Sequence, residues 1–315
     1  MQMNYFGEMV AIIVAFSWTF TALFFEYAGK RIGSLQVNLI RLIFAGGMLS
    51  LLLQLMSGQM FPVGADLRTW MWLSLSGLVG FVFGDLCLFY SYTLITSRFS
   101  QLIMTLAPPF AALFSLLLLN ERTNVTGWIG MAITLSGIAI SVFKKGAEHN
   151  EKKGFVLHLP LRGILLALGG AIGQGLGIVL SKKGMLCYAE TFDTDPFFRN
   201  YIPFAATQIR VITGIVGFTA ITLLNGSIPK LVKALYDKKG MWATFAGSFF
   251  GPFMGVSLSL TAVRYTQTGI ASTIMATVPI LILIPYAILY KQRPRSIEVL
   301  GAILCVLGVA CFFIL

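Results

Sequence analysis

Four ionisable side chains, Glu26, Arg41, Asp85 and Arg210, lie inside long apolar stretches of the sequence. A charge in apolar surroundings is costly unless it is paired, so such residues usually form ion pairs, carry protons or bind charged ligands. Arg41 and Asp85 lie at similar depths in neighbouring stretches that are expected to run antiparallel. We therefore expect an ion pair between them, with Glu26 approaching the same face. Asp85 is also a candidate for proton exchange. The alternative to the ion pair is that Arg41 extends alone to the nearest polar boundary of the membrane.

The composition indicates which solvent surrounds these stretches. Hydrophobic residues make up 57% of the 315 residues and charged residues 11%, and the mean hydropathy is +0.83. A soluble domain carries about 25% charged residues, so too few are present here to cover a water-exposed surface. This composition excludes a secreted disulfide scaffold, a disordered chain and a cytosolic α/β enzyme. It predicts an all-α, multi-pass protein of the cell membrane, surrounded by lipid.

Ten stretches are apolar enough to span a membrane, which takes about 20 residues. They are 9–27, 35–56, 69–92, 99–119, 125–143, 162–181, 202–224, 241–263, 269–290 and 296–315. Most connections between them are short, so consecutive segments are expected to be antiparallel. The lysines and arginines are concentrated in the odd-numbered connections, which places both termini outside by the positive-inside rule.

The sequence also repeats itself. One constant offset, without a gap, superposes Gly80 on Gly251, Gly84 on Gly255, Ile103-Met104 on Ile274-Met275, Pro108 on Pro279, Arg122 on Arg293, Gly130 on Gly301, and Gly137 on Gly308. A slightly smaller offset superposes Arg41 on Arg210, and a third superposes Gly7 on Gly163. We therefore expect a first five-helix repeat over residues 1–143, a connecting loop over 144–161 and a second repeat over 162–315. Because five is odd, the second repeat enters the membrane from the opposite side, which is the inverted-repeat architecture of secondary transporters.

The repeat relation leaves Arg210 without the acidic neighbours of Arg41. The position of Asp85 is occupied by Val256, and the approximate counterpart of Glu26 is Lys182. Two interpretations remain open. Arg210 either extends to the membrane interface, which is the simpler interpretation, or supplies positive charge to an anionic solute.

The pattern resembles the drug/metabolite transporter superfamily, in its ten-helix EamA-like branch. The resemblance rests on Ser17-Trp18, on Arg41, on the run Ser91-Tyr92-Thr93-Leu94, and on Pro108 followed by Leu118-Leu119-Asn120-Glu121, Gly130 and Gly137. It covers essentially the whole chain, although Asn120, Gln292 and Gln174 depart from the residues that are usual in the family. The resemblance implies a solute carrier whose cavity is lined largely by the first, third, fourth, sixth, eighth and ninth segments. It also implies cytoplasmic termini, which conflicts with the distribution of basic residues.

Polar residues at mid-depth in these segments are candidates for substrate binding. Trp18 and Gln174 occupy the same repeat position, where an indole and an amide suit a cavity better than lipid. The other candidates are Arg210, Thr105, Ser259, Ser272 and Thr277. For each serine or threonine the alternative role is a hydrogen bond to its own helix backbone. The glycines between Gly169 and Gly177 lack the strand and acidic residue of a dinucleotide site, so they indicate close helix packing.

Three function classes fit a polytopic chain. A carrier for a small metabolite, such as an amino acid or related organic solute, is favoured, with export as the expected direction and alternating access as the mechanism. A membrane-embedded enzyme would need a metal or acid–base motif, and a passive channel would need a charged ring or carbonyl filter; neither pattern is found in the sequence. There is no Walker-type motif, so the driving force is expected to be an ion gradient, with protons as one candidate, or substrate exchange.

No cofactor, catalytic residue or metal site is predicted. His149 and His158 have no carboxylate or thiol at ligand spacing, and the four cysteines show no C-x-x-C spacing. The expected partners are membrane lipid and a small-molecule substrate, without nucleic acid. The chain is expected to be a monomer or a weak dimer.

Overall fold

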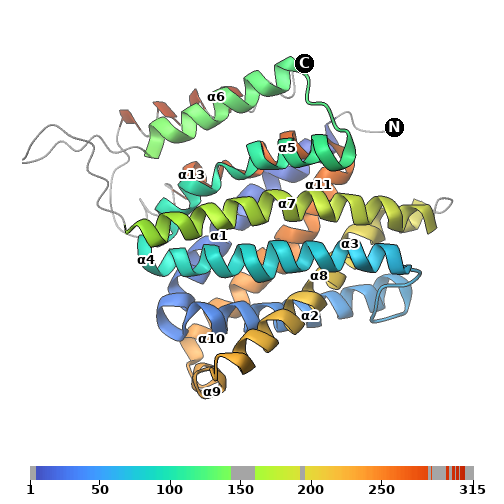
Figure 1. Cartoon of the computed structure of the whole chain (residues 1–315), viewed down its shortest axis with the longest axis vertical. Coiled ribbons are helices and arrows are strands. Elements are labelled where there is room, and N and C mark those ends of the chain that lie inside the picture. The colour runs from blue at the N-terminus through green and yellow to red at the C-terminus, as the bar shows by residue number, and fades with distance from the viewer. Residues whose placement is uncertain are drawn as a thin grey trace, which may run out of the picture.

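The computed structural model describes residues 5–142, 160–191 and 196–282, together with single residues and short runs between 285 and 308. Every regular element in this part of the chain is helical, which confirms the all-α prediction. The long helices pack into one bundle (Figure 1). In chain order the elements are α1 (Phe6–Ile32), α2 (Ser34–Ser57), α3 (Leu67–Gly77), η1 (Leu78–Asp85), α4 (Leu86–Met104), α5 (Ala107–Leu119), α6 (Val125–Val142), α7 (Leu161–Thr191), α8 (Pro196–Leu224), α9 (Ile228–Leu235), α10 (Lys238–Ser248), η2 (Phe249–Gly255), α11 (Val256–Tyr265), α12 (Thr268–Met275) and α13 (Val278–Leu281).

Six helices among the described residues are long and apolar enough to cross a membrane. They are Phe6–Ile32, Ser34–Ser57, Leu67–Ile95, Leu161–Glu190, Asn200–Leu224 and Lys238–Tyr265, and shorter apolar helices cover Ala107–Leu119, Val125–Gly137 and Thr268–Leu281. These nine correspond to the first nine predicted segments, the ninth of them in part. The predicted tenth segment, 296–315, lies largely outside the described residues. The short helix α9 falls in the predicted connection between the seventh and eighth segments and was not anticipated.

The short connection predicted between the third and fourth segments, residues 93–98, is helical. Helix α4 continues to Met104, yet the chain reverses within it. The Ser91 hydroxyl donates to that of Ser100 at 2.7 Å, and the Gln101 amide donates to the Tyr92 hydroxyl at 2.6 Å. A straight helix would separate residues nine apart by about 13 Å along its axis. The side-chain hydrogen bonds therefore hold a tight helical reversal at this point.

Two π-helical segments occupy the same position in the two repeats. The segment η1 covers Leu78–Asp85 and η2 covers Phe249–Gly255, and their first residues are related by the same offset that joins Gly80 to Gly251. Each lies inside a long helix, between α3 and α4 in the first repeat and between α10 and α11 in the second. A π-helical segment rotates the residues that follow it around the helix axis, and such segments often occur at functional sites.

The predicted fourth and ninth segments are each interrupted. The first breaks at Thr105-Leu106, between α4 and α5, and the second at Ala276-Thr277, between α12 and α13. Pro108 and Pro279 follow the breaks at equivalent positions. Proline has no amide hydrogen, so it cannot donate to the carbonyl four residues before it. The breaks follow from the repeated prolines.

Contacts between the repeats have the pattern of a two-fold axis. Helix α1 packs against α10, η2 and α11, and in the same way α7 packs against α3, η1 and α4. Helix α2 packs against its own counterpart α8, and the contact of α5 with α12 has its equivalent in the contact of α13 with α4. Exchanging the two repeats leaves this set of contacts unchanged, as a two-fold axis requires.

The repeats run in opposite directions. The backbone of α7 approaches Ile95 at Gly163 and Leu73 at Gly184, so α7 is antiparallel to α3–α4. Gly7 near the start of α1 packs against Thr266, and Lys182 toward the end of α7 donates to the Thr266 carbonyl, so the start of α1 lies near the end of α7. Helices α1 and α7 therefore run antiparallel although they hold the same repeat position. We name the two ends of the bundle after α1, as the Phe6 end and the Ile32 end.

Glycines set the closest helix contacts. A Cβ atom on Gly173 of α7 would lie 2.7 Å from the Cα of Gly84, and one on Gly177 would lie 2.9 Å from the Cα of Gly80. Real side chains do not approach a backbone so closely, so these positions accept only glycine. This accounts for the glycine-rich stretch as a packing surface.

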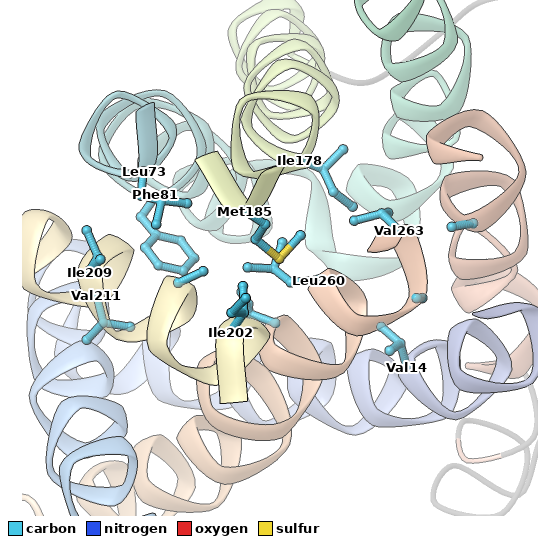
Figure 2. Packing of buried hydrophobic residues seen from close by; sticks show 14 of the residues in the cluster. Val14, Leu73, Phe81, Ile178, Met185, Ile202, Ile209, Val211, Leu260 and Val263 are labelled. Atoms are coloured by element: carbon cyan, nitrogen blue, oxygen red, sulfur yellow. The ribbon is translucent and has the colours of Figure 1, made fainter. Parts of the chain in front are cut away.

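The apolar core lies between several helices. Met185, Ile202 and Leu260 converge there from α7, α8 and α11 (Figure 2).

Two aspartates cap equivalent helices. Asp66 accepts from the Thr69 amide at 2.8 Å before α3, and Asp237 accepts from the Gly240 amide at 2.8 Å before α10. The two capping pairs are repeat equivalents, related by the offset that joins Gly80 to Gly251. The hydrogen bond from Thr69 holds the pKa of Asp66 below its ordinary value of 3.8. The pKa of Asp237 is lowered chiefly by the Arg31 guanidinium, whose Nε lies 2.6 Å from the carboxylate, and also by the Gly240 amide.

Candidate functional site

A cavity with an empty volume of about 970 Å³ lies between the two repeats. Both halves contribute to its wall, and the π-helical segments and the two helix breaks border it. Phe81 and Asp85 line it from η1, Gly251 and Pro252 from η2, and Met104, Ala107, Met275, Ala276 and Val278 line it from the residues that flank the breaks. Because each irregularity occurs at equivalent positions of the two repeats, both sides of the cavity are built from repeat-related segments.

Arg41 and Asp85 form the predicted ion pair inside this cavity. Arg41 Nη2 lies 2.6 Å from Asp85 Oδ2, and the Arg41 side chain is 3% exposed. Arg41 Nε also donates to Asn38 Oδ1 at 3.1 Å. The guanidinium carbon is 4.6 Å from the centre of the Phe89 ring, within the range of a cation–π contact. Burial and pairing exclude the alternative in which Arg41 extends alone to the interface.

Glu26 is placed differently from the expectation. Its carboxylate accepts hydrogen bonds from the backbone amide of Ser97, at 3.3 Å, and from the Ser97 hydroxyl. It also lies 2.5 Å from Lys30 Nζ, one turn further along α1. Glu26 reaches the depth of Arg41 but points to the helical reversal of α4, and it does not line the cavity. Glu26 thus approaches the same end of the bundle as Arg41 and Asp85, as expected, but does not join them in the lining of the cavity.

Arg210 lies in the cavity and does not extend to the interface. Its relative exposure is 4%, and its guanidinium carbon is 4.6 Å from the centre of the Phe81 ring. Arg210 Nε is buried without a hydrogen-bond partner. The interpretation in which this side chain extends to the membrane surface is therefore wrong, because the fold encloses it between α8 and η1.

Trp18 and Gln174 line the cavity from opposite repeats, on α1 and α7. Ser259 and Ser272 line it as well, from α11 and α12. The Ser259 hydroxyl donates to the Val256 carbonyl at 2.8 Å, whereas the Ser272 hydroxyl is buried without a partner. The structure thus brings seven of the ten candidate residues to one cavity.

Thr105 and Thr277 are the two candidates besides Glu26 that do not line it. They lie in the two helix breaks, and the Thr277 hydroxyl donates to the Ile274 carbonyl at 2.8 Å. Threonine in such a break readily satisfies a carbonyl that the interrupted helix leaves free. For Thr277 the structure therefore shows the alternative role, a hydrogen bond to the backbone of its own helix, in place of a position in the cavity wall.

Several polar residues of the site, including Thr21 of the cavity wall, were not predicted. Asn38 supports Arg41, and Tyr92 and Gln101 line the cavity while bonded to each other. Asn38 precedes Arg41 by three residues, so the two share a helix face, and this spacing was a usable signal. No comparable signal joins Tyr92 to Gln101, because their contact depends on the reversal of α4.

A second polar cluster lies at the Phe6 end. Lys182 Nζ is 2.5 Å from Glu121 Oε1 and 2.8 Å from the Thr266 carbonyl oxygen. The other oxygen of Glu121 accepts from the Thr268 amide at 3.1 Å, and the Thr266 hydroxyl donates to Glu8. These contacts join α7, α5 and the turn between α11 and α12, so they tie the two repeats together at one end of the bundle.

No group of three or more His, Cys, Asp or Glu side chains that could hold a metal ion occurs in the described part of the chain. Cys87 and Cys187 are free thiols there, and Cys187 is buried. The histidines His149 and His158, like Cys305 and Cys311, lie outside the described residues.

Comparison with known proteins gives consistent matches. The model of the EamA-like transporter family matches residues 5–143 and again 161–314. A Bacillus subtilis (strain 168) protein named as the uncharacterized transporter YdfC is 25% identical over 281 residues, which is 88% of this chain and 80% of that protein. A protein of known crystal structure superposes with a TM-score of 0.68 at 16% identity, covering 98% of this chain and 96% of its own, which shows the shared fold. With both halves matched by one family model, the chain belongs to the EamA-like transporter family.

Proposed function

We propose that the protein is a secondary active transporter that moves a small organic metabolite across the cell membrane by alternating access, in the direction of export. The observation that supports it most strongly is the cavity between two antiparallel repeats, with equivalent helix irregularities on its two sides. Such a site can be opened to either side by related movements of the two halves. In this proposal the halves are residues 1–143 and 162–315, and Trp18, Gln174, Arg210, Ser259 and Ser272 contact the solute.

Counterflow in proteoliposomes tests this function. Vesicles are loaded with a high concentration of unlabelled solute, and uptake of the labelled solute is followed, using amino acids and organic acids that raise the thermal stability of the purified protein. A carrier shows transient accumulation because the inner solute returns the binding site to the outside. A passive channel equilibrates the label without accumulation, and an enzyme would change the solute chemically. Uptake without trans-stimulation would contradict the proposal.

Proton coupling through Asp85 is a separable part of the proposal. Asp85 Oδ2 lies 2.6 Å from Arg41 Nη2, so in this proposal the carboxylate exchanges a proton only when the pair opens. Such an opening can accompany the change of access. The substitution Asp85→Asn should then abolish accumulation driven by a pH gradient while counterflow continues. Accumulation with unchanged pH dependence in this variant would exclude the proton role and leave the carrier function intact.

A further inference from the structure

Arg41 and Gln101 of the first repeat have hydrogen-bond partners in the cavity, whereas their equivalents in the second repeat, Arg210 and Ser272, have polar atoms buried without one. Arg41 is bonded to both Asp85 and Asn38. Its equivalent, Arg210, forms no hydrogen bond with any residue that the structure describes, and its Nε is buried without a partner. Two side chains of the same type, in the same repeat position and facing one cavity, therefore differ in whether a carboxylate is hydrogen-bonded to them.

The substitutions between the repeats explain the difference. Asp85 is replaced by Val256, which lines the cavity, and Asn38 is replaced by Thr207 at the same offset that relates Arg41 to Arg210. The Thr207 hydroxyl donates to the Pro203 carbonyl of its own helix at 2.8 Å, so it does not support the arginine. Both partners of the first arginine are thus absent from the second repeat.

Ser272 follows the same pattern. It is the equivalent of Gln101 at the offset that joins Gly80 to Gly251, and Gln101 is bonded to Tyr92. The position of Tyr92 is occupied by Val263, and the Ser272 hydroxyl is buried without a partner. A second polar group on this side of the cavity therefore lacks a hydrogen bond that the first repeat supplies from within the protein.

The charges of the cavity do not balance. Among the residues that the structure describes, the charged ones that line it are Arg41, Asp85 and Arg210, which gives one excess positive charge. The one carboxylate among them, Asp85, already bonds Arg41 at 2.6 Å. An uncompensated cation in surroundings of low dielectric constant is expensive, and a ligand with one negative charge would remove this cost.

We infer that the transported solute is a small organic monoanion, and that its carboxylate binds Arg210. This inference rests on the proposed transport function and names its substrate class. A guanidinium offers a carboxylate two parallel hydrogen bonds, while a phosphate monoester carries close to two charges, more than the cavity neutralises. The Ser272 hydroxyl and the Gln174 amide supply further hydrogen bonds to the polar part of the solute. The body of the solute is apolar, because Trp18, Leu88, Phe89, Ile178 and Met275 form much of the remaining wall.

Matched pairs of ligands test the charge requirement. The full-length protein in detergent is titrated with benzoate and benzamide, with phenylacetate and phenylacetamide, and with hexanoate and hexanamide, and its thermal transition is followed. Within each pair the body is the same and only the charge differs. The acid is expected to bind about tenfold or more tightly than its amide and to raise the transition temperature. A panel in which no acid shifts the transition further than its amide overturns the inference.

Two variants assign the effect to Arg210. The substitution Arg210→Gln should abolish the preference for the acids. Arg68→Gln is the matched control, because Arg68 is 72% exposed and does not line the cavity. The substitution Val256→Asp restores the acid of the first repeat, and it should abolish acid binding by giving Arg210 an internal partner. If the Val256→Asp protein does not fold, Arg210→Gln with its control decides alone, and an unchanged acid preference in Arg210→Gln overturns the inference.

The inference and the transport function can fail separately. Counterflow of an amide or another neutral solute, together with equal binding of acid and amide, would refute the anion site and leave the carrier. Binding of acids that depends on Arg210, without trans-stimulated uptake of any of them, would support the anion site and refute the carrier. Trans-stimulated uptake of an acid, lost in Arg210→Gln and retained in Arg68→Gln, supports both.

Discussion

Ser97 and Thr268 are equivalent residues of the two repeats, and the backbone amide of each donates to a glutamate carboxylate. Ser97 bonds to Glu26 on α1, and Thr268 bonds to Glu121 after α5. The two glutamates are not repeat equivalents, since Lys182 occupies the position of Glu26. Lys182 instead binds Glu121. Each repeat thus places a carboxylate at the equivalent backbone amide, but the carboxylate comes from a different helix. In the second repeat Thr268 begins α12, where free amides favour a negative charge.

Lys182 and Glu121 should be energetically coupled. Their side chains are 12% and 18% exposed, between a surface pair and a buried one, so Lys182→Met or Glu121→Gln should each cost about 1–3 kcal/mol. The double variant should cost less than the sum of the two, as measured by thermal unfolding in detergent. The matched control is Arg68 with Glu190, which are 72% and 69% exposed and should show no coupling. Additive effects at Lys182 and Glu121 would contradict the ion pair.

Asp85→Asn should destabilise the protein strongly. The change leaves the buried Arg41 charge without its counter-ion, and removal of one partner of a buried pair costs about 3–5 kcal/mol. The double variant Arg41→Met with Asp85→Leu removes both charges and should recover much of this loss. Thermal unfolding of the two proteins gives the comparison. A double variant less stable than Asp85→Asn would show that the cavity needs the pair for more than charge balance.

Gly173→Ala should lower stability through a steric clash. The new Cβ atom would lie 2.7 Å from the Cα of Gly84 and 2.9 Å from the Val79 carbonyl oxygen, and backbone atoms cannot move aside cheaply. Overpacking of this kind costs about 1–3 kcal/mol. Gly47→Ala is the matched control, because nothing lies within 4 Å of the added atom. Equal transition temperatures for the two variants would mean that α7 and η1 are less tightly packed than these distances require.

The capping contact of Asp237 predicts a pH dependence. Its pKa is lowered in the folded protein, chiefly by Arg31, so its contribution to stability is present above the ordinary value of 3.8 and is lost as the pH falls through the lowered value. Asp237→Asn should therefore be less stable than the native protein at about pH 6, and the difference should shrink toward about pH 3. Transition temperatures across this range provide the measurement. A difference that does not change with pH would exclude the charged contact.

The common level of Arg41 and Asp85 was predictable because it depends on depth alone. A helix rises about 1.5 Å per residue, so counting residues from the segment ends places both side chains at one level, and short connections make the helices antiparallel. The internal repeat could also be predicted from the sequence. The same alignment of the repeats shows that Val256 replaces the acid at the position of Asp85. These features follow from the order of residues along the chain.

The rotation of each helix about its axis was decided by tertiary packing. Glu26 lies at the expected end of the bundle but faces Ser97, and Tyr92 meets Gln101 only because α4 reverses within a continuous helix. Arg210 could have extended to the interface by depth alone, and its 4% exposure reflects the enclosure of α8 by η1. Close approaches at Gly80, Gly84, Gly173 and Gly177 fix the rotation of η1 against α7. Residue order determined which groups share a level in the membrane, and tertiary packing decided which of them face one another, because the rotation of a helix about its axis depends on its contacts with neighbouring helices.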